Sequence, residues 1–479
     1  MSLDPENWDA VQAVARRMVD DMLDYQRTVR DRAPWRSMPT EAKARLEEPV
    51  PWEGASLEAV YEAFVRDVLP YPTGNIHPRF WGWVMGTGTP TGMLAEMLAA
   101  GMNPHGAGYD QSSAVVERLV LDWMKTLMGF PPEASGVLVS GGTAANFNGL
   151  LAARVAKAGF DVRKHGLYGG PRLTVYGSAE THSWAVKACE TLGLGSEGFR
   201  KIAVDAEYRL DIEACRAAIQ ADLDQGFRPI CLVGNAGTVN TGAVDDLVAL
   251  RRLADEFGLW FHIDGAFGSM VAWSDSRDLV KGQELADSIG FDLHKWGYMP
   301  IEVAVVLTRD SEAQRDAFAL TAGSAAYLAS NGRGLSNDTT YFADRGLQLT
   351  RGFRALKVWM SMKEQGVTRI GAAIQKNIDQ ARYLGALVDA HPALQRLAPV
   401  SMNIVCFRYV KAGLDEAALN RLNQSLLAEL QERGIAVPSQ TVLKGSFALR
   451  VCVTNHRSEQ EDFDALVKAV LALGEELSG

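Results

Sequence analysis

The chain has 479 residues, which is too long for one ordinary hydrophobic core, so two or three packed regions are expected. Its formal net charge of -10 at pH 7 argues against a nucleic-acid groove or an anionic membrane surface, because both recruit clustered lysine and arginine. No apolar run approaches the roughly eighteen residues that a membrane-spanning helix needs. A small molecule is therefore the expected partner, with no nucleic acid and no membrane.

Cysteine usage and the first residues indicate the compartment. The five cysteines lie far apart, without a C-x-x-C spacing, at Cys189, Cys215, Cys231, Cys406 and Cys452. This scatter is typical of reduced thiols and offers no zinc signature, so no metal site is expected. The opening MSLDPENWDA is acidic, and neither a secretory signal nor a transit peptide is predicted. The sequence therefore predicts a cytoplasmic protein.

Residues 1–80 are predicted to form an N-terminal helical arm. Apolar residues recur at steps of three or four from Val11 to Met22, as in an amphipathic helix, and a polar, proline-containing stretch at 33–54 interrupts the pattern. Such an arm cannot bury its apolar faces alone. We expect it to wrap a larger body or a second subunit.

Residues 81–365 are predicted to form a large α/β domain. Short apolar runs alternate there with helical segments, at 137–140, 173–178, 201–205, 230–235, 259–264 and 303–308. Continuous apolar runs are typical of largely parallel strands that are buried on both faces. Residues 366–479, with a long helix, strands near 401–409 and 446–453 and a final helix, are predicted to form a smaller α+β domain.

Two polar features follow predicted strands, where ligands of α/β sheets bind. In VLVSGGTAANFNGL, Gly141, Gly142 and Thr143 stand at a helix start, where free backbone N–H groups and the helix dipole favour a phosphate. A tight turn from strand to helix also needs glycine for steric reasons alone. His182 follows the strand at 173–178, and is either a residue that starts a helix or a ligand contact.

Two further features are a carboxylate and an amine. Asp264 ends the apolar run LWFHID, where burial is costly unless the carboxylate meets a cation or several donors; otherwise it caps the next turn. Lys295 lies in the apolar, aromatic segment DSIGFDLHKWGYMP. It is either a snorkelling surface lysine or a partly desolvated nucleophile toward an aldehyde. Together, the four features match what pyridoxal 5'-phosphate (PLP) requires.

The chain resembles the group II PLP-dependent amino-acid decarboxylases, which include aromatic-L-amino-acid, histidine, tyrosine and glutamate decarboxylases. The likeness covers nearly the whole chain and rests on HKW at 294–296, HIDGAFGS at 262–269, GNAGTVNTGAVD at 234–245, SGGTAAN at 140–146 and RGFRALKVW at 351–359. It implies the aspartate-aminotransferase-like fold (fold type I) and a homodimer with its active site at the subunit interface.

The resemblance also implies roles for single residues. Lys295 is similar to the lysine that binds PLP as a Schiff base, Asp264 to the partner of the pyridine nitrogen, and His182 to the histidine stacked on the ring. The other implied cofactor contacts are Gly142, Thr143, Thr238, Ala266, Asp292 and His294. Asp292 departs from the N-P-H-K common in aromatic-amino-acid decarboxylases. Because an acid beside a phosphate dianion is unfavourable, we expect Asp292 to point away or to accept a hydrogen bond.

The implied reaction is that of a carboxy-lyase, which converts an L-amino acid to an amine and carbon dioxide. An aromatic substrate is the leading expectation. The aromatic residues near the expected pocket are Phe80, Trp81, Trp83 and Tyr109, although such residues are also common in cores and interfaces. Tyr327, in a segment rich in Gly, Ser and Asn, is similar to the loop tyrosine that returns a proton to Cα. Its alternative role is packing.

Three other functions stay open. An aminotransferase generally needs an arginine for the α-carboxylate, and Arg351 and Arg354 lie on a predicted helix that is structural in the family. An aldehyde synthase on the same fold often carries phenylalanine where this chain has Tyr327. A non-catalytic PLP-binding protein would not require both Lys295 and Asp264.

Overall fold

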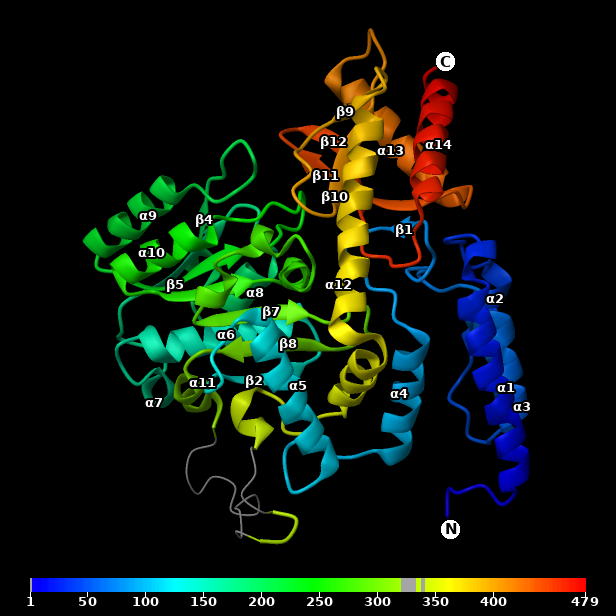
Figure 1. Ribbon diagram of the computed structural model, residues 1–479, viewed down its shortest axis with the longest axis horizontal. Helices are drawn as coiled ribbons and strands as arrows, with labels where there is room; N and C mark the ends of the chain where they lie inside the picture. Colours follow the sequence, from blue (N-terminus) through cyan, green and yellow to red (C-terminus); the bar gives the residue numbers. More distant parts are fainter. Residues whose placement is uncertain (1, 320–332, 337–340) are drawn as a thin grey trace. The chain divides into compact units, whose positions relative to one another are not determined.

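The computed structural model describes residues 2–319, 333–336 and 341–479. They form two compact units, whose elements are labelled in Figure 1. The first unit contains residues up to 85, 383–397 and 406–479, and the second contains the described residues of 86–382 together with 398–405. The division into an arm, a large domain and a small domain stays a prediction.

The second unit is built on a seven-stranded sheet with the order β2-β8-β7-β6-β5-β3-β4. Its strands are β2 (Ser135–Val139), β3 (Leu173–Ser178), β4 (Phe199–Ile202), β5 (Arg228–Asn235), β6 (Trp260–Asp264), β7 (Ser288–Asp292) and β8 (Ala304–Thr308). Neighbours from β4 to β7 pair in parallel, whereas β8 is antiparallel to both of its neighbours. The predicted, largely parallel sheet is confirmed.

The strands are buried because helices pack on the sheet. All residues of β3, β6, β7 and β8 are buried, and α6 packs against β5, β6, β7 and β8. The apolar runs of the sequence therefore correspond to strands without a solvent-facing side. β7 is absent from the predicted runs, because its five residues, SIGFD, include a glycine and an aspartate.

The helices of the second unit precede, connect and follow these strands along the chain. They are α4 (Pro90–Met102), α5 (Ser112–Met128), α6 (Gly142–Lys157), α7 (Val162–His165), α8 (Trp184–Thr191), α9 (Ile212–Asp224), α10 (Leu247–Phe257) and α11 (Ser311–Phe318). α12 (Arg354–Asp389) contains a break at Gly366 and contributes residues to both units. Short 3₁₀ turns lie at Val29–Asp31, Ser196–Gly198, Gly268–Trp273, Arg277–Val280, Gln283–Leu285 and Phe342–Arg345.

The first unit combines N-terminal helices with a second sheet, of order β1-β11-β12-β10-β9. Its helices are α1 (Trp8–Arg27), α2 (Thr40–Leu46), α3 (Leu57–Ala63), a π-helix at Phe64–Val68, α13 (Glu416–Glu432) and α14 (Gln460–Ser478). Its strands are β1 (Phe80–Trp81), β9 (Leu394–Arg396), β10 (Ile404–Tyr409), β11 (Val437–Leu443) and β12 (Ser446–Cys452). β1 pairs in parallel with β11 and so ties the N-terminal segment to this sheet. None of the helices within the described ranges is both long and apolar enough to cross a membrane.

Candidate active site

The predicted site residues lie just beyond the carboxyl ends of strands in the large sheet. β2, β3, β5, β6 and β7 run in the same direction, because β8 is antiparallel to both β2 and β7. Their carboxyl ends therefore share one edge of the sheet. The residues that follow these ends are Gly142 and Thr143 after β2, His182 after β3, Thr238 after β5, Ala266 after β6 and Lys295 after β7.

Lys295 lies in the turn after β7 and is paired with an acid. Its Nζ is 2.7 Å from Oδ2 of Asp292, the last residue of β7, and the lysine side chain is 24 % exposed. The neighbouring Trp296 is fully buried and donates its indole N–H to Oδ1 of Asn377 on α12 at 3.1 Å. This anchor holds the turn against the core. Lys295 is therefore not a snorkelling surface lysine, since its amine meets a buried carboxylate.

Asp292 faces the start of α6. A Cβ atom on Gly142 would lie 2.8 Å from Oδ2 of Asp292 and 3.3 Å from Cβ of Ala266, so only glycine fits at this position. The other oxygen of Asp292, Oδ1, is buried and has no hydrogen-bond partner among the described residues. Asp292 thus accepts a bond from Lys295 and does not point away from the site.

Asp264, the last residue of β6, is buried and held by two N–H donors. Its Oδ2 accepts a hydrogen bond from the indole Nε1 of Trp184 at 2.6 Å, and its Oδ1 accepts one from the backbone N of Ala266 at 3.1 Å. The second bond caps the turn after β6, which is the alternative role that the sequence analysis gave to Asp264. Within the described ranges, Asp264 has no ion-pair partner. Trp184 was not predicted; a tryptophan two residues after His182 was the available signal, because a buried indole N–H needs an acceptor.

His182 starts the segment that becomes α8. Its side chain is exposed, and its Nδ1 accepts a hydrogen bond from the backbone N of Trp184 at 3.2 Å. The histidine thus fits the alternative of a residue at a helix start. It is also connected through Trp184 to Asp264, so both residues that were predicted to contact a ring belong to one hydrogen-bonded group. Stacking of His182 on the ring stays a prediction.

His294 and Ala266 also lie in this region. Nδ1 of His294 is 2.9 Å from the backbone O of Val303 and accepts from Val303 N at 3.1 Å. Burial lowers the pKa of His294, so its imidazole is neutral near pH 7. A Cβ atom on Gly141 would lie 3.6 Å from Cε1 of this ring. Ala266 links the strand ends, because its carbonyl accepts from the backbone N of Asp292 at 2.9 Å.

The two threonines differ in exposure. Thr143 is exposed in the first turn of α6. Thr238 is buried, and its hydroxyl oxygen accepts from the backbone N of Ala243 and lies 3.1 Å from the hydroxyl of Thr241. Thr238 therefore holds its own loop together. Tyr327 lies outside the described residues.

The aromatic residues of the expected pocket are divided between packing and exposure. Phe80 and Trp81 are buried in the first unit, where Trp81 stacks on Phe463 with ring centroids 4.9 Å apart. Trp83 of the same unit is exposed. Tyr109, in the second unit, meets Tyr341 edge to face at 6.0 Å. For Phe80 and Trp81, the alternative of core packing therefore holds.

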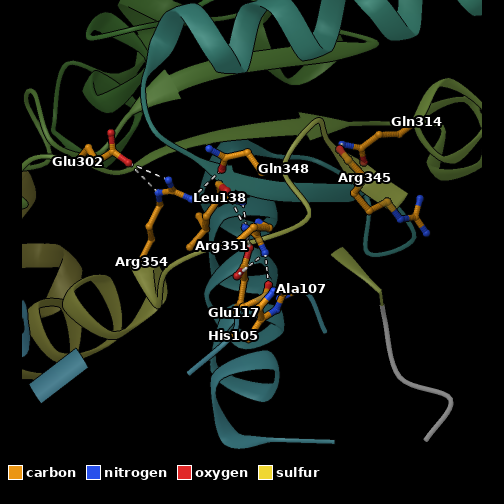
Figure 2. Close-up of polar contacts among 11 residues, drawn as sticks. His105, Ala107, Glu117, Leu138, Glu302, Gln314, Arg345, Gln348, Arg351 and Arg354 are labelled. Atoms are coloured by element: carbon orange, nitrogen blue, oxygen red, sulfur yellow. Dashed lines mark hydrogen bonds and ion pairs between the residues drawn. The ribbon is translucent and has the colours of Figure 1, made fainter. Parts of the chain in front are cut away.

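Arg351 and Arg354 are both engaged in ion pairs within the second unit (Figure 2). Arg351 is buried and forms a two-pronged ion pair with the buried Glu117 of α5, at 3.0 Å from Nη1 to Oε2, and also donates to the carbonyls of Gly106 and Leu138. Arg354 donates to Glu302 at 2.8 Å. Neither arginine is free to bind a substrate carboxylate.

We expect removal of either charge of the Arg351–Glu117 pair to destabilise the fold strongly. Glu117→Gln or Arg351→Met leaves one buried charge without its partner, which costs about 3–5 kcal/mol. Urea unfolding would measure the loss. The double variant Glu117→Met/Arg351→Met should recover part of the stability, and breaking the exposed Arg172–Glu197 pair should change it little. If breaking the buried Arg351–Glu117 pair lowered the free energy of unfolding as little as breaking the exposed pair, this explanation would be wrong.

Comparison with known proteins identifies the family. The pyridoxal-dependent decarboxylase conserved domain matches residues 39–410. The chain belongs to the pyridoxal-dependent decarboxylase family. It is 32 % identical to aromatic-L-amino-acid decarboxylase from Bacillus atrophaeus over 442 residues, which cover 91 % of this chain and 89 % of that protein. This decarboxylase is thus a PLP-dependent amino-acid decarboxylase with PLP as its cofactor.

Two further relatives show the range of the family. The decarboxylase is 29 % identical over 471 residues to phenylacetaldehyde synthase from Arabidopsis thaliana, with 96 % of this chain and 94 % of that protein covered. A crystal structure of Oryza sativa TDC with PLP and tryptamine superimposes with a TM-score of 0.91 at 25 % identity, covering 100 % of both chains. The expected fold type I is confirmed.

The described residues of the decarboxylase fit PLP. The first turn of α6, whose N-cap Gly141 makes no side-chain cap, offers backbone N–H groups to a phosphate, and the amine of Lys295 and the carboxylate of Asp264 stand at adjacent strand ends. Asp292 is an acid near Gly142 and would oppose a dianion there. Its ion pair with Lys295 offsets that negative charge, and its unpartnered Oδ1 can accept a further hydrogen bond.

A neutral histidine lies beneath this site. His262 is fully buried in β6, with Nδ1 2.8 Å from the hydroxyl of Ser288 and Nε2 3.0 Å from Oδ1 of Asn146. Burial lowers its pKa to about 4, although the nearby carboxylate of Asp264 raises it in part. His262 therefore stays uncharged in the folded decarboxylase at neutral pH.

We expect this histidine to make the fold less stable in acid. An unfolded histidine takes up a proton below its ordinary pKa of about 6.5, whereas folded His262 does so only near a pKa of about 4. The free energy of unfolding therefore has its full contribution from His262 above pH 6.5 and decreases as the pH falls from 6.5 to 4. At pH 5 the loss from His262 is on the order of 2 kcal/mol. Urea unfolding at pH 7 and at pH 5 measures this decrease in the free energy of unfolding. Between pH 7 and pH 5, His262→Gln should lose less unfolding free energy than the wild type. Equal losses would count against this origin.

Proposed function

We propose that this decarboxylase converts an aromatic L-amino acid to its amine and carbon dioxide, with Lys295 binding the cofactor aldehyde and Asp264 facing the ring nitrogen. The placement of these two groups at the ends of the adjacent parallel strands β6 and β7 carries the proposal. A carboxylate that is buried without an ion pair among the described residues is costly unless a cation completes its environment. A protonated ring nitrogen is such a cation.

Each side chain has a task in this arrangement. PLP supplies, when bound, a ring that accepts the electrons released from Cα. Asp264 keeps a negative charge opposite the ring nitrogen and so favours its protonated form. Asp292 holds the ammonium of Lys295 whenever that amine is free, and so keeps it within the site. Exposed His182, at the end of β3, is available to cover one face of the ring.

The ion pairs of the arginines support decarboxylation over transamination. An arginine bound to the α-carboxylate would stabilise that anion and oppose the loss of carbon dioxide. Arg351 is committed to Glu117, and Arg354 to Glu302. An α-carboxylate that neither arginine binds lacks this stabilisation, which favours the loss of neutral carbon dioxide.

The aromatic substrate is inferred from relatives. One is named for aromatic L-amino acids and another, tryptophan decarboxylase 2 of Oryza sativa, for tryptophan, and both match across most of their length. The test is a screen of the purified protein against the proteinogenic amino acids and L-DOPA, with carbon dioxide and organic product recorded together. An amine from an aromatic substrate supports the proposal. Keto-acid formation would indicate an aminotransferase, and bound cofactor without turnover would indicate a binding protein.

An aldehyde synthase is the second candidate, because phenylacetaldehyde synthases of two plants are also similar to this chain. Tyr327 distinguishes the two reactions if its hydroxyl returns the proton to Cα. Tyr327→Phe is then expected to slow amine formation by roughly 10²-fold or more and to favour oxygen-dependent aldehyde production. Amine, aldehyde and oxygen consumption would be measured together. An unchanged product ratio would remove the proposed role of Tyr327.

We also infer a cytoplasmic homodimer with the active site at the subunit interface. α4 and α5 expose large apolar side chains, namely Met97, Leu98, Met102, Val115 and Leu119, which a second copy would cover. All five cysteines, which lie among the described residues, are buried and outside disulfides, which fits a reducing compartment. Analytical ultracentrifugation of the full chain tests the assembly, and a monomer with full activity would contradict it.

A further inference from the structure

We propose that Trp184 is a positioning residue, which orients the carboxylate of Asp264 toward the nitrogen of the cofactor ring. This inference rests on the proposed function, because it assumes that Asp264 meets that nitrogen. The tryptophan lies on α8, beyond the end of β3, whereas Asp264 ends β6. The two strands are separated in the sheet by β5, so only the tertiary structure brings the two residues together.

The carboxylate of Asp264 is held at both oxygens by N–H groups. The indole of Trp184 donates to Oδ2 at 2.6 Å, and the backbone N of Ala266 donates to Oδ1 at 3.1 Å. Two donors on different oxygens fix the plane of a carboxylate, while each oxygen keeps a further lone pair. Without the indole N–H, one oxygen loses its donor and rotation about the Cβ–Cγ bond is opposed by one bond only.

Trp184 itself is rigid. It is almost fully buried, and its ring meets the ring of His262 edge to face at 5.7 Å. Its backbone N donates to Nδ1 of His182 at 3.2 Å. One residue thus bonds to both side chains that are expected to contact the ring, the acid through its indole and the histidine through its backbone.

The charges around Asp264 make this orientation matter. The buried His262 next to it is neutral, and the described residues place no lysine or arginine in an ion pair with it. Indole and backbone N–H groups are neutral donors, so they stabilise the anion without neutralising it. The described residues therefore give the carboxylate no counter-charge of their own, and the indole determines how its oxygens are oriented toward the ring nitrogen.

The experiment compares two cofactors on the full-length apoprotein. One is PLP, and the other is its carba analogue, in which C–H replaces the ring nitrogen. The wild type should bind PLP more tightly than the analogue, because only PLP offers a protonated nitrogen to Asp264. Trp184→Phe keeps the aromatic packing and removes the N–H. We expect it to reduce the preference for PLP by roughly tenfold, while affinity for the analogue changes by less than about twofold.

A matched control is Trp273→Phe. Trp273 is also buried in the second unit, but its indole N–H has no hydrogen-bond partner among the described residues. This variant should keep the wild-type preference. If Trp184→Phe does not fold, 3-benzothienylalanine at position 184, with sulfur in place of N–H, makes the same comparison at nearly the same shape.

The outcomes separate the two assignments. If removal of the N–H weakens the binding of PLP and of the analogue equally, or changes neither affinity, the indole contributes only packing and the proposal for Trp184 is wrong. If the wild type does not distinguish PLP from the analogue, Asp264 does not meet the ring nitrogen, and this part of the proposed function fails together with the role of Trp184. A selective loss of PLP preference supports both.

Discussion

Lys295→Ala is expected to reduce decarboxylation by at least about 10³-fold, because it removes the amine that is proposed to bind the cofactor covalently. The structure shows where this amine lies. Nζ of Lys295 lies at the end of β7, held 2.7 Å from Asp292, with the glycine at the start of α6 next to that same carboxylate. Absorbance of the bound cofactor and borohydride reduction, followed by peptide mass spectrometry, would locate the adduct in the wild type and show its loss.

Two companion variants separate covalent attachment from charge and stability. Lys295→Arg keeps a cation beside Asp292 but cannot form the bond, so it should fold as stably as the wild type and still be inactive. Lys357→Ala removes another buried lysine, which pairs with Glu96 and donates to the carbonyl of Glu302 at 3.0 Å. It should lose stability and retain the trapped adduct. An adduct at Lys357, or activity in Lys295→Arg, would overturn the assignment.

Asp264→Asn is expected to lower kcat by roughly 10²–10³-fold while leaving a folded protein that still binds the cofactor more weakly. The carboxamide has nearly the same shape, and its oxygen can still accept from Trp184, so the local structure should persist. What is lost is the negative charge opposite the ring nitrogen. Electrons released at Cα then have a poorer acceptor. Steady-state kinetics and cofactor titration would measure the two effects separately.

The matched control for Asp264→Asn is Asp222→Asn. Asp222 is another buried carboxylate of the second unit, held by Arg200 at 2.8 Å and by the hydroxyl of Tyr176 at 2.6 Å. Its replacement should reduce stability without changing the cofactor spectrum. Equal kcat losses in both variants would show that Asp264 acts only through the fold.

Two buried acids at one sheet edge therefore have different expected roles because their partners differ. Asp292 is neutralised by Lys295 within the protein, and Asp264 receives only neutral N–H donors from the described residues. The charge that Asp264 retains is thus available to a ligand, whereas the charge of Asp292 serves the lysine. Sequence position alone does not distinguish them, since each is the last residue of a buried strand.

The sequence by itself determined the α/β fold class, most of the strands, and the positions of Asp264 at the end of one strand and of His182 beyond the end of another. It did so because apolar runs and the residues that end them depend on neighbours close in the chain. β7 was absent from the predicted runs, since a glycine and an aspartate weaken its short run, and the strand order that puts β6 beside it was not predicted.

Only the tertiary structure decided which side chains meet. The indole of Trp184 reaches a carboxylate 80 positions away, and Arg351 is buried against Glu117, 234 positions away. Such contacts arise when distant elements pack together, and nothing in the local pattern specifies them. A buried polar group must find its partner wherever packing allows, so the partners of Asp264, Asp292 and Arg351 follow from the assembled fold.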